Sequence, residues 1–537
     1  MNKYETDGNL LEKKQKCAIT ALRVTLTQSP GKSTRQASAE LNISCHSLQR
    51  ILHVDLKLFP YELTVQAVKK STSGGCGRLD GVSDDTDFEL WDSRWGPRGW
   101  CKPSCIPITV ILILIVLVVL LPLMEQKEIE LAKSSSSLCS QSCRFSLVES
   151  IPEGLIYPNG TKFHASTYDV WSDLINLAQH SIEIGSFYWT LRSNDVSPGD
   201  PSSQKGEDIF QALLKAGIQN KVNIRIAQNF PSGSMTNVDT EILSQKGAAE
   251  VRSVNFPKLM GGGVLHTKLW IVDQEHFYVG SANLDWRALT QVKEMGIVVY
   301  NCSCLAADIL KIFEVYWFLG NPDSKIPSKW PETLSTQYNI NTPFSININT
   351  TNKADVFIAS SPPPFCPDGR STDIDTILDI IAKAENFINI AVMDYFPMEI
   401  YSPKKRFWPV IDNALRAAAI DNHVKVRLLI SYWNHTRAEA QNFLRSLTDI
   451  NVPSTPEQAK IPFARVNHNK YMVTDNAAYI GTSNWSGDYF TKTGGVSVVV
   501  RTSNSKNETS HNTLRDQLQE VFDRDWSSVY ATPLVNA

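Results

Sequence analysis

The apolar pattern of the chain is dominated at one point by a single uninterrupted run. Residues 106–124 read IPITVILILIVLVVLLPLM and contain no charged side chain. A helix of this length measures about 28 Å, which is enough to cross the ~30 Å hydrocarbon core of a bilayer. A buried core helix would keep a polar face, and a cleaved signal peptide would lie nearer the N-terminus. The run therefore predicts one transmembrane helix.

The segments on either side of this run show no pattern of a folded core. Residues 1–105 lack sustained periodicity, and Ser71–Asp85 has the composition of a linker, so we expect a largely disordered tail. Residues 125–145 include the serine run Ser134–Ser137 and predict a stalk. A compact body is expected only from about residue 146 onward.

Within this body the hydrophobic pattern occurs twice. Each copy has two strand-like runs, then a polar motif, and finally a similar aromatic segment: 182–189, 222–227 and 312–317 in the first copy, and 388–396, 424–430 and 521–526 in the second. A period this long indicates two homologous domains, which we place at 146–335 and 336–537. Because strands alternate with helical stretches, the sequence predicts the α/β class, with a mixed sheet flanked by helices in each domain.

The two copies differ just before the polar motif. The first copy has a strand-like run at Ala249–Phe256, whereas the second has only Asn451–Val466, which contains three prolines. Proline is excluded from the interior of a sheet. We therefore expect a strand to be missing from the second domain.

The polar motif of each copy reads H-x-K-x-x-x-x-D and is followed by G-[ST]-x-N. Residues two apart on a strand point the same way, so each motif should present an imidazole and an ammonium group to one site. A single H-x-K pair would usually be incidental, but two copies with matched Asp and Asn residues are not. The residues are His266, Lys268, Asp273, Ser281 and Asn283 in the first copy, and His468, Lys470, Asp475, Thr482 and Asn484 in the second.

These side chains suit the cleavage of a phosphodiester. Histidine can act as a nucleophile or as an acid near neutral pH. Two lysines can stabilise the charge on the non-bridging oxygens, and the Asn, Ser and Thr side chains can donate further hydrogen bonds. The set requires neither a metal nor a cofactor, and we expect none. The net charge of −3 favours no class of substrate.

With these motifs the chain resembles the phospholipase D superfamily, and within it the membrane-anchored endolysosomal exonucleases, phospholipase D family members 3 and 4. The resemblance covers about residues 140–530 and leaves out the long N-terminal tail. The segments that carry it are Leu147–Leu155, Phe187–Leu191, Leu265–Trp286, Tyr300–Leu305, Arg465–Thr474 and Tyr479–Ser486.

The resemblance implies one active site at the interface of two phospholipase D-type domains. It implies a 5′-to-3′ exonuclease that acts on single-stranded DNA and RNA through a phosphohistidine. We assign His266 as the nucleophile and His468 as the acid, with Asp273 and Asp475 in supporting roles. Glu294 is expected to orient a catalytic histidine, and the same offset in the second copy gives Gly495.

Five cysteines follow the apolar run, in an arrangement that suits an oxidising compartment. The C-x3-C and C-x-C pairs can form disulfides, and a zinc site is a poorer fit because no histidine lies near. The resemblance implies that Cys139 and Cys143 pair with Cys302 and Cys304, and it leaves Cys366 without a partner.

Glycosylation triplets give the orientation of the chain in the membrane. Basic residues just before and after the apolar run favour a cytosolic N-terminus only weakly. We therefore expect a single-pass type II protein of the endoplasmic reticulum, Golgi and endolysosome, with a lumenal body that proteolysis could release. Six triplets follow the run, at Asn159, Asn301, Asn349, Asn434, Asn484 and Asn507, against one before it, at Asn42.

Two other functions remain open at this point. The same histidines could transfer or hydrolyse a phospholipid, because the phosphohistidine step does not depend on what the phosphate carries. A non-catalytic receptor or scaffold is the third hypothesis, although both motifs are intact. The candidate partners are single-stranded nucleic acid, the membrane, phospholipid and a second copy of the chain. Phe187, Tyr188 and Trp189 are candidates for stacking bases, but an aromatic run at a strand end more often belongs to the core.

Overall fold

The computed structural model describes the body of the chain, and its residues belong to one compact unit. The predicted tail, the apolar run and most of the predicted stalk lie outside the described residues. Among the residues that are described, no helix is long and apolar enough to cross a membrane. The described residues are 139, 141–233, 237–347, 353–402, 404–433, 435–437, 440, 443–444, 448–450, 461–502 and 513–533.

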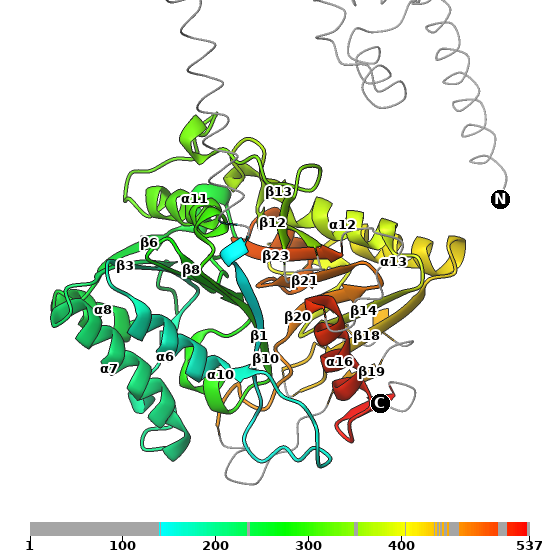
Figure 1. Cartoon of the computed structure of the whole chain (residues 1–537), viewed down its shortest axis with the longest axis horizontal. Coiled ribbons are helices and arrows are strands. Elements are labelled where there is room, and N and C mark those ends of the chain that lie inside the picture. The colour runs from blue at the N-terminus through cyan, green and yellow to red at the C-terminus, as the bar shows by residue number, and fades with distance from the viewer. Residues whose placement is uncertain are drawn as a thin grey trace, which may run out of the picture. The chain divides into compact units, whose positions relative to one another are not determined.

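Two mixed sheets form the centre of the body (Figure 1). In spatial order the first sheet contains β2 (Ala165–Ser166), β1 (Arg144–Ser150), β10 (Glu294–Tyr300), β8 (His276–Gly280), β7 (Leu269–Val272), β3 (Ser181–Ser186), β5 (Asn223–Asn229) and β6 (Glu250–Val254). The second contains β11 (Phe344–Asn347), β12 (Lys353–Ser361), β23 (Gly495–Thr502), β21 (Ala477–Gly481), β20 (Lys470–Thr474), β14 (Phe387–Val392), β18 (Lys425–Ser431), β19 (Thr448–Ile450) and β24 (Ala531–Pro533), with β13 (Ser371–Thr372) beside β12.

The two sheets have the same strand order over seven strands. The run β1-β10-β8-β7-β3-β5-β6 of the first sheet corresponds to β12-β23-β21-β20-β14-β18-β19 of the second. In both, the pairs at the far edge are parallel and the central pairs are antiparallel. The predicted α/β class with two similar halves is the architecture that the structure shows.

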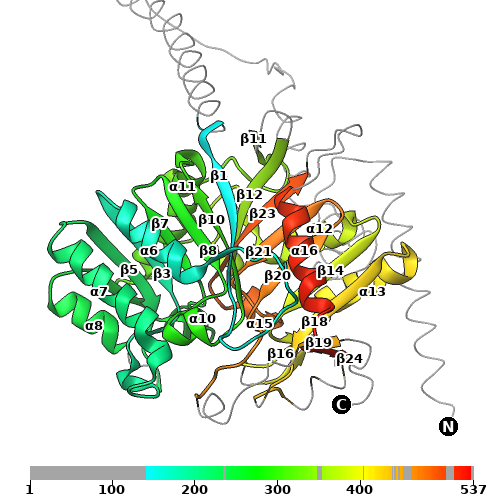
Figure 2. The same ribbon diagram turned by 60° about the horizontal axis from the view of Figure 1, so that its bottom comes forward.

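Helices cover the outer faces of both sheets. Figure 1 and Figure 2 show α6 (Thr167–Leu177), α7 (Gln204–Ile218) and α8 (Val238–Gln245) on one side, and α12 (Asp373–Lys383) and α13 (Val410–Asp421) on the other. The corresponding helices α6 and α12 begin in the same way. Ser166 and Thr372 lie at their N-caps and accept a hydrogen bond from the backbone three residues later.

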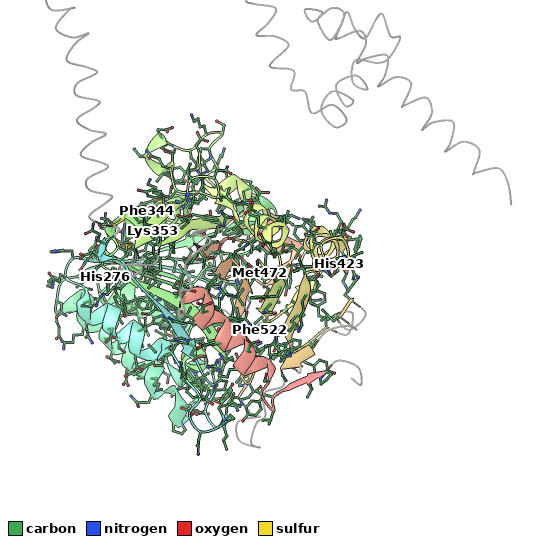
Figure 3. All side chains as sticks on the ribbon, turned by 45° about the vertical axis from the view of Figure 1, so that its right-hand side comes forward. His276, Phe344, Lys353, His423, Met472 and Phe522 are labelled. Carbon is green, nitrogen blue, oxygen red and sulfur yellow. A yellow bond between two sulfur atoms is a disulfide. The ribbon has the colours of Figure 1, made fainter. Side chains whose placement is uncertain are left out.

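The apolar core lies in three layers, because alternate strand residues face opposite ways. Leu269 and Ile271 of β7 pack between the sheets, together with Phe522 of α16 (Leu514–Trp526). Trp270 packs outward under α6 and α7, and Met472 of β20 packs under α12 and α13. Figure 3 labels Met472 and Phe522 within this packing. The central layer is continuous across both halves and also contains α11 (Ser303–Leu319).

The strand expected to be missing from the second half is present in shortened form. β19 pairs in parallel with β18, as β6 does with β5 in the first half. It lies at Thr448–Ile450, just before the proline-containing segment, and comprises three residues. The prediction was wrong because it looked for the strand among residues 451–466. β24 then pairs with the outer edge of β19.

The end of the predicted stalk also belongs to the body. Arg144 and Phe145 are the first residues of β1 and pair with Tyr300 and Val299 of β10. Just before them, two disulfides join this segment to the start of α11, which confirms the pairing of the four cysteines. The bonds are Cys139–Cys304 and Cys143–Cys302, and Cys366 is free.

Candidate active site

The two histidine motifs are brought together by backbone pairing across the two halves. The amide nitrogen of His266 donates to the carbonyl oxygen of Gly494 at 2.9 Å. In the mirror arrangement, the amide nitrogen of His468 donates to the carbonyl oxygen of Lys293 at 2.8 Å. Gly494 directly precedes β23 in the second half, and Lys293 directly precedes β10 in the first half. The site therefore exists only when both halves are folded against each other.

Each lysine contacts the histidine of its own motif. The Nζ of Lys268 donates to the carbonyl oxygen of His266 at 2.6 Å, and that of Lys470 donates to the carbonyl oxygen of His468 at 2.5 Å. The motifs were predicted to lie within strands. Both histidines instead precede the strands, since β7 begins at Leu269 and β20 begins at Lys470. The spacing of two residues still places the paired side chains in one site.

The imidazole of His266 is held by a backbone carbonyl of the other half. Its Nδ1 lies 2.9 Å from the carbonyl oxygen of Thr482. A carbonyl oxygen can only accept a hydrogen bond, so this contact requires the tautomer with the proton on Nδ1, although Lys268 Nζ also lies 3.1 Å from that nitrogen. The neutral ring then has its free electron pair on Nε2. Phe187 and Tyr489 both pack against this imidazole, with ring centroids 5.0 Å away in each case.

The imidazole of His468 is held by a carboxyl group of the other half. Its Nδ1 lies 3.0 Å and 2.9 Å from the two oxygens of Glu294. The hydroxyl of Ser281 donates to Glu294 at 2.5 Å and so fixes the carboxyl group in place. The second half offers no such carboxyl group to His266, because Gly495 occupies the position of Glu294.

Burial controls the protonation of this site. It lowers the pKa of both histidines, and Lys268 and Lys470 lower them further. Burial also lowers the pKa of Lys470 to about 7 and raises that of Glu294 to about 8. An anion bound among these groups would favour the charged forms of the lysines and histidines. The site is therefore adapted to receive a negatively charged ligand.

Both histidines line one cavity of about 540 Å³. Asn283 and Asn484 line it as well, and their amide nitrogens donate to the hydroxyls of Tyr188 and Tyr489 at 3.4 Å and 3.1 Å. The side-chain oxygens of these two asparagines are buried and have no hydrogen-bond partner among the described residues. They can accept hydrogen bonds from a ligand.

The two motif aspartates, for which supporting roles were expected, bind backbone amides rather than the cavity. Asp273 accepts hydrogen bonds from the backbone nitrogens of Gln179, His180 and Ser181, at 2.7–2.8 Å. Asp475 does the same for the backbone of residues 385–387. Each aspartate fastens the start of a central strand to a neighbouring hairpin, and neither lines the cavity.

Two other predicted phosphate contacts also have a supporting place. Ser281 donates to Glu294, and the hydroxyl of Thr482 accepts from the backbone nitrogen of Val496 at 3.1 Å. Neither hydroxyl lines the cavity. Asn484, a candidate for glycosylation, is 3% exposed and points into the site, so the folded chain cannot carry a glycan there. Asn159 lies on an exposed turn, and Asn349, Asn434 and Asn507 lie outside the described residues.

Several lining residues could not be assigned from the sequence. Tyr188 donates to Asp285 at 2.9 Å, and Asp285 pairs with Arg287. These three residues line the cavity together with Phe187, for which both base stacking and a place in the core had been considered. The only signal for this part of the cavity was the aromatic run that contains Phe187 and Tyr188. Besides His468 and Asn484, the second half lines the cavity with Met393, Asp394, Tyr401, Trp433, Pro462, Phe463, Val466 and Tyr489.

A buried ionic cluster supports the segment that holds His468. Lys293 Nζ lies 3.1 Å from Glu149 of β1 and 3.4 Å from Asp525 of α16. Arg524 pairs with the same two carboxylates at 2.7 Å and 2.9 Å. Burial opposes ionisation of Glu149, but Lys293 and Arg524 outweigh it and lower the pKa of that carboxyl group. The cluster thus connects β1 of the first half and α16 of the second half to Lys293, whose carbonyl oxygen binds the backbone of His468.

On the side of His266, the residues that match Glu149, Lys293 and Asp525 are uncharged. The strand register sets Ser360 at the position of Glu149, and Gly494 at that of Lys293. Tyr316 of α11 takes the place of Asp525 and donates to the carbonyl oxygen of Gly495 at 3.3 Å. The same frame therefore has an ionic support on one side and a neutral support on the other.

Comparison with known proteins places this site in a family. The family model described as "PLD3/4, PLD-like domain" matches residues 159–466. The chain is 50% identical over 410 residues to the human "5'-3' exonuclease PLD3", covering 74% of this chain and 82% of the relative. It is 48% identical to the Xenopus tropicalis protein of that name, over 76% of this chain and 84% of the relative. It is 41% identical to the mouse "5'-3' exonuclease PLD4", over 75% and 82%.

The family model covers the first histidine motif and ends just before the second. Its matched residues do not include the N-terminal tail. The chain belongs to the PLD3/4 family of phospholipase D-like proteins.

Proposed function

We propose that the chain is a 5′-to-3′ exonuclease that shortens single-stranded DNA and RNA through a phosphohistidine intermediate. The observation that carries this proposal is the single cavity lined by His266 and His468, each held by the opposite half of the body. Relatives at 41–50% identity carry the name 5'-3' exonuclease. All the side chains that the chemistry requires are present.

In the first step His266 is the nucleophile. Its Nε2 attacks the phosphorus, the bond from phosphorus to the 5′-oxygen of the next nucleotide breaks, and the protonated His468 gives its Nε2 proton to that oxygen. The terminal nucleotide is then attached to His266 through its 3′-phosphoryl group. Lys268 and Lys470 offset the negative charge on the phosphoryl oxygens.

In the second step water replaces His266. His468, now neutral, takes a proton from the water as its oxygen attacks the phosphorus. The phosphorus–nitrogen bond breaks and a nucleoside 3′-phosphate leaves. His266 returns to its neutral form and His468 is again protonated, so the cycle is balanced without a further reactant.

The contacts of the two rings favour this assignment of roles. Glu294 offers a carboxyl group to His468, which stabilises an imidazolium and so suits the acid. Thr482 offers a neutral carbonyl to His266, which fixes the tautomer with a free Nε2 but does not favour a charge. The two lysines disfavour protonation of both rings, so the assignment rests on the group that meets each Nδ1.

The proposal places this chemistry in an endolysosomal lumen. The apolar run at 106–124 would anchor the chain, and the two disulfides suit an oxidising compartment. Glycans at Asn159 and Asn301 would mark the lumenal side. A tryptic glycopeptide map of the chain from mammalian membranes tests this, and unmodified Asn159 and Asn301 would contradict a lumenal body.

The activity itself is tested with the full-length chain purified in detergent. Wild type, His266→Ala and His468→Ala are incubated with 5′-hydroxyl single-stranded oligonucleotides and with a chelator. Stepwise shortening from the 5′ end by wild type alone is the expected result. Intact oligonucleotides with a folded wild-type protein would contradict the exonuclease. Release of a headgroup from phospholipid vesicles under those conditions would instead favour lipid chemistry.

A further inference from the structure

Three aromatic rings of the second half lie together at the cavity. His435 and Phe463 are stacked, with ring centroids 4.6 Å apart and an angle of 20° between the planes. The ring centroid of Trp433 lies 4.8 Å from that of His435, with an angle of 65° between the planes. Trp433 and Phe463 line the same cavity as the two motif histidines. We call Trp433, His435 and Phe463 the aromatic platform.

The platform is exposed although it is largely apolar. Phe463 is 58% exposed, and its backbone has φ +57°, which is unusual for a bulky residue. Such backbone strain tends to persist at sites of ligand contact, where the surrounding structure fixes it. The indole nitrogen of Trp433 is buried and has no hydrogen-bond partner among the described residues.

The loop that carries Phe463 is fixed to the first half. Arg287 donates to the carbonyl oxygen of Pro462 at 2.5 Å, and Asp285 in turn holds Arg287. Two residues after Phe463, the backbone nitrogen of Arg465 donates to the carbonyl oxygen of Gln291 at 3.0 Å. The exposed ring is therefore presented by a fastened segment, beside a wall that belongs to the active site.

We propose that the aromatic platform is a stacking site for an unpaired nucleobase next to the scissile phosphate. This rests on the proposed exonuclease function and names the part of the site that would select single strands. An aromatic face accepts any base, since every base has a π-face, but only a base that is not paired can reach it. The platform would thus give selectivity for single strands without selectivity for sequence.

A lipid is a poorer occupant of the same place. Acyl chains require a continuous apolar surface, whereas Asp285, Arg287 and Asp394 line this cavity beside the rings. The platform also includes an imidazole, which can stack on a base and still be solvated. The observations therefore favour a base over an acyl chain.

The test compares normal and abasic strands. Phe463→Leu keeps an apolar side chain but removes the aromatic face, and Phe463→Tyr keeps the face. In a full-length His266→Ala background, which prevents turnover, the dissociation constant for a single-stranded oligonucleotide should rise about 5- to 100-fold with Phe463→Leu, the range for loss of one stacked base. It should change less than twofold with Phe463→Tyr. Binding of an oligonucleotide with abasic sites at its 5′ end should not change with either variant.

Phe407→Leu is the matched control, because Phe407 is 64% exposed on β17 (Arg406–Phe407) but does not line the cavity. It should leave both constants unchanged. If Phe463→Leu weakened the binding of normal and abasic strands equally, or weakened neither, the proposed role of the platform would be overturned. Loss of binding to anionic phosphatidylglycerol vesicles with unchanged oligonucleotide binding would overturn it in favour of a lipid.

The two proposals fail in different ways. If wild type binds oligonucleotides but cleaves none, the exonuclease proposal fails while the binding comparison still decides on the platform. If wild type cleaves normally and Phe463→Leu binds normal strands as well as wild type does, only the platform fails.

Discussion

The two halves of the body share one backbone frame but support their catalytic histidines differently. His266 faces the Thr482 carbonyl, and behind it the uncharged Tyr316 donates a hydrogen bond to the backbone of Gly495. His468 faces the Glu294 carboxyl group, and behind it Lys293 lies among buried charges. A small number of substitutions within the duplicated frame is thus sufficient to give the two histidines different chemical roles.

The difference concerns protons rather than position. The backbone bond that holds His266 is 2.9 Å long and its counterpart at His468 is 2.8 Å long, so both rings are placed with similar firmness. Only the atoms that meet Nδ1 differ in charge. Environments that push the pKa values of two similar groups apart are a common way to separate an acid from a nucleophile.

Removal of the charge at Glu294 should have the largest effect on this comparison. Glu294→Gln keeps the shape and can still accept a hydrogen bond, but it cannot balance an imidazolium. We expect kcat for oligonucleotides to fall about 10²- to 10⁴-fold, the usual contribution of a positioned general acid. The pKa of His468 should fall further, so the acid form and the remaining activity should move to lower pH. A pH profile of kcat checks this, and an unshifted profile would contradict the role of Glu294.

Substitution of Lys293 tests how much the buried ionic cluster contributes to stability. Lys293→Met should lower the free energy of unfolding by about 3 kcal/mol, because it leaves Arg524 as the remaining cationic partner of the buried carboxylates among the described residues. The pKa of Glu149 lies below that of the unfolded chain, so its contribution to stability is present at neutral pH and is lost only as pH falls through the folded pKa. The difference in free energy of unfolding between wild type and Lys293→Met should therefore be the same in urea titrations at pH 7 and at pH 5. Its disappearance at pH 5 would contradict the cluster.

Substitution of the two motif aspartates should have similar effects in the two halves, unlike substitution of the two histidines. Asp273→Asn and Asp475→Asn each weaken a carboxylate that accepts several backbone hydrogen bonds, at a cost of about 1.5–3 kcal/mol. We expect similar losses of stability in the two halves and nearly normal kcat per folded molecule. Thermal unfolding measured beside activity checks both points. A selective loss of kcat in one variant would show that this aspartate takes part in catalysis.

Tyr316 should show the smallest effect. Tyr316→Phe removes one hydrogen bond to the Gly495 carbonyl and no charge, so the expected loss of stability is about 1 kcal/mol. It is the matched control for Lys293→Met, since both act on the strand that crosses to the opposite histidine. Equal losses in the two variants, measured by urea titration, would show that the ionic and neutral supports are equivalent.

Much of this arrangement can be predicted from the sequence. Period-two apolar runs and the repeated H-x-K motifs predict two similar α/β halves and one shared site, because residue spacing alone fixes which side chains share a face. The partner of each imidazole cannot be predicted in that way. Thr482 contacts His266 through its backbone carbonyl, which any residue would provide, and Glu294 reaches a histidine of the other half.

The remaining misses have similar causes. β19 is so short that no alternation could reveal it, and only its pairing with β18 identifies it as the counterpart of β6. Trp433, His435 and Phe463 come from two separate loops, and their meeting depends on the fold of the whole half. Asn484 matches a glycosylation triplet, but the triplet carries no information on burial.

The central claim, that His266 forms the covalent bond and His468 moves the proton, is tested most directly with a substrate whose leaving group needs no proton. Thymidine 3′-(4-nitrophenyl phosphate) releases nitrophenolate, which leaves without an acid. In rapid mixing, His468→Ala should release about one nitrophenolate per active site in a burst and then stall, because no base activates water. His266→Ala should give no burst. A burst from His266→Ala and none from His468→Ala would show that the two roles are reversed.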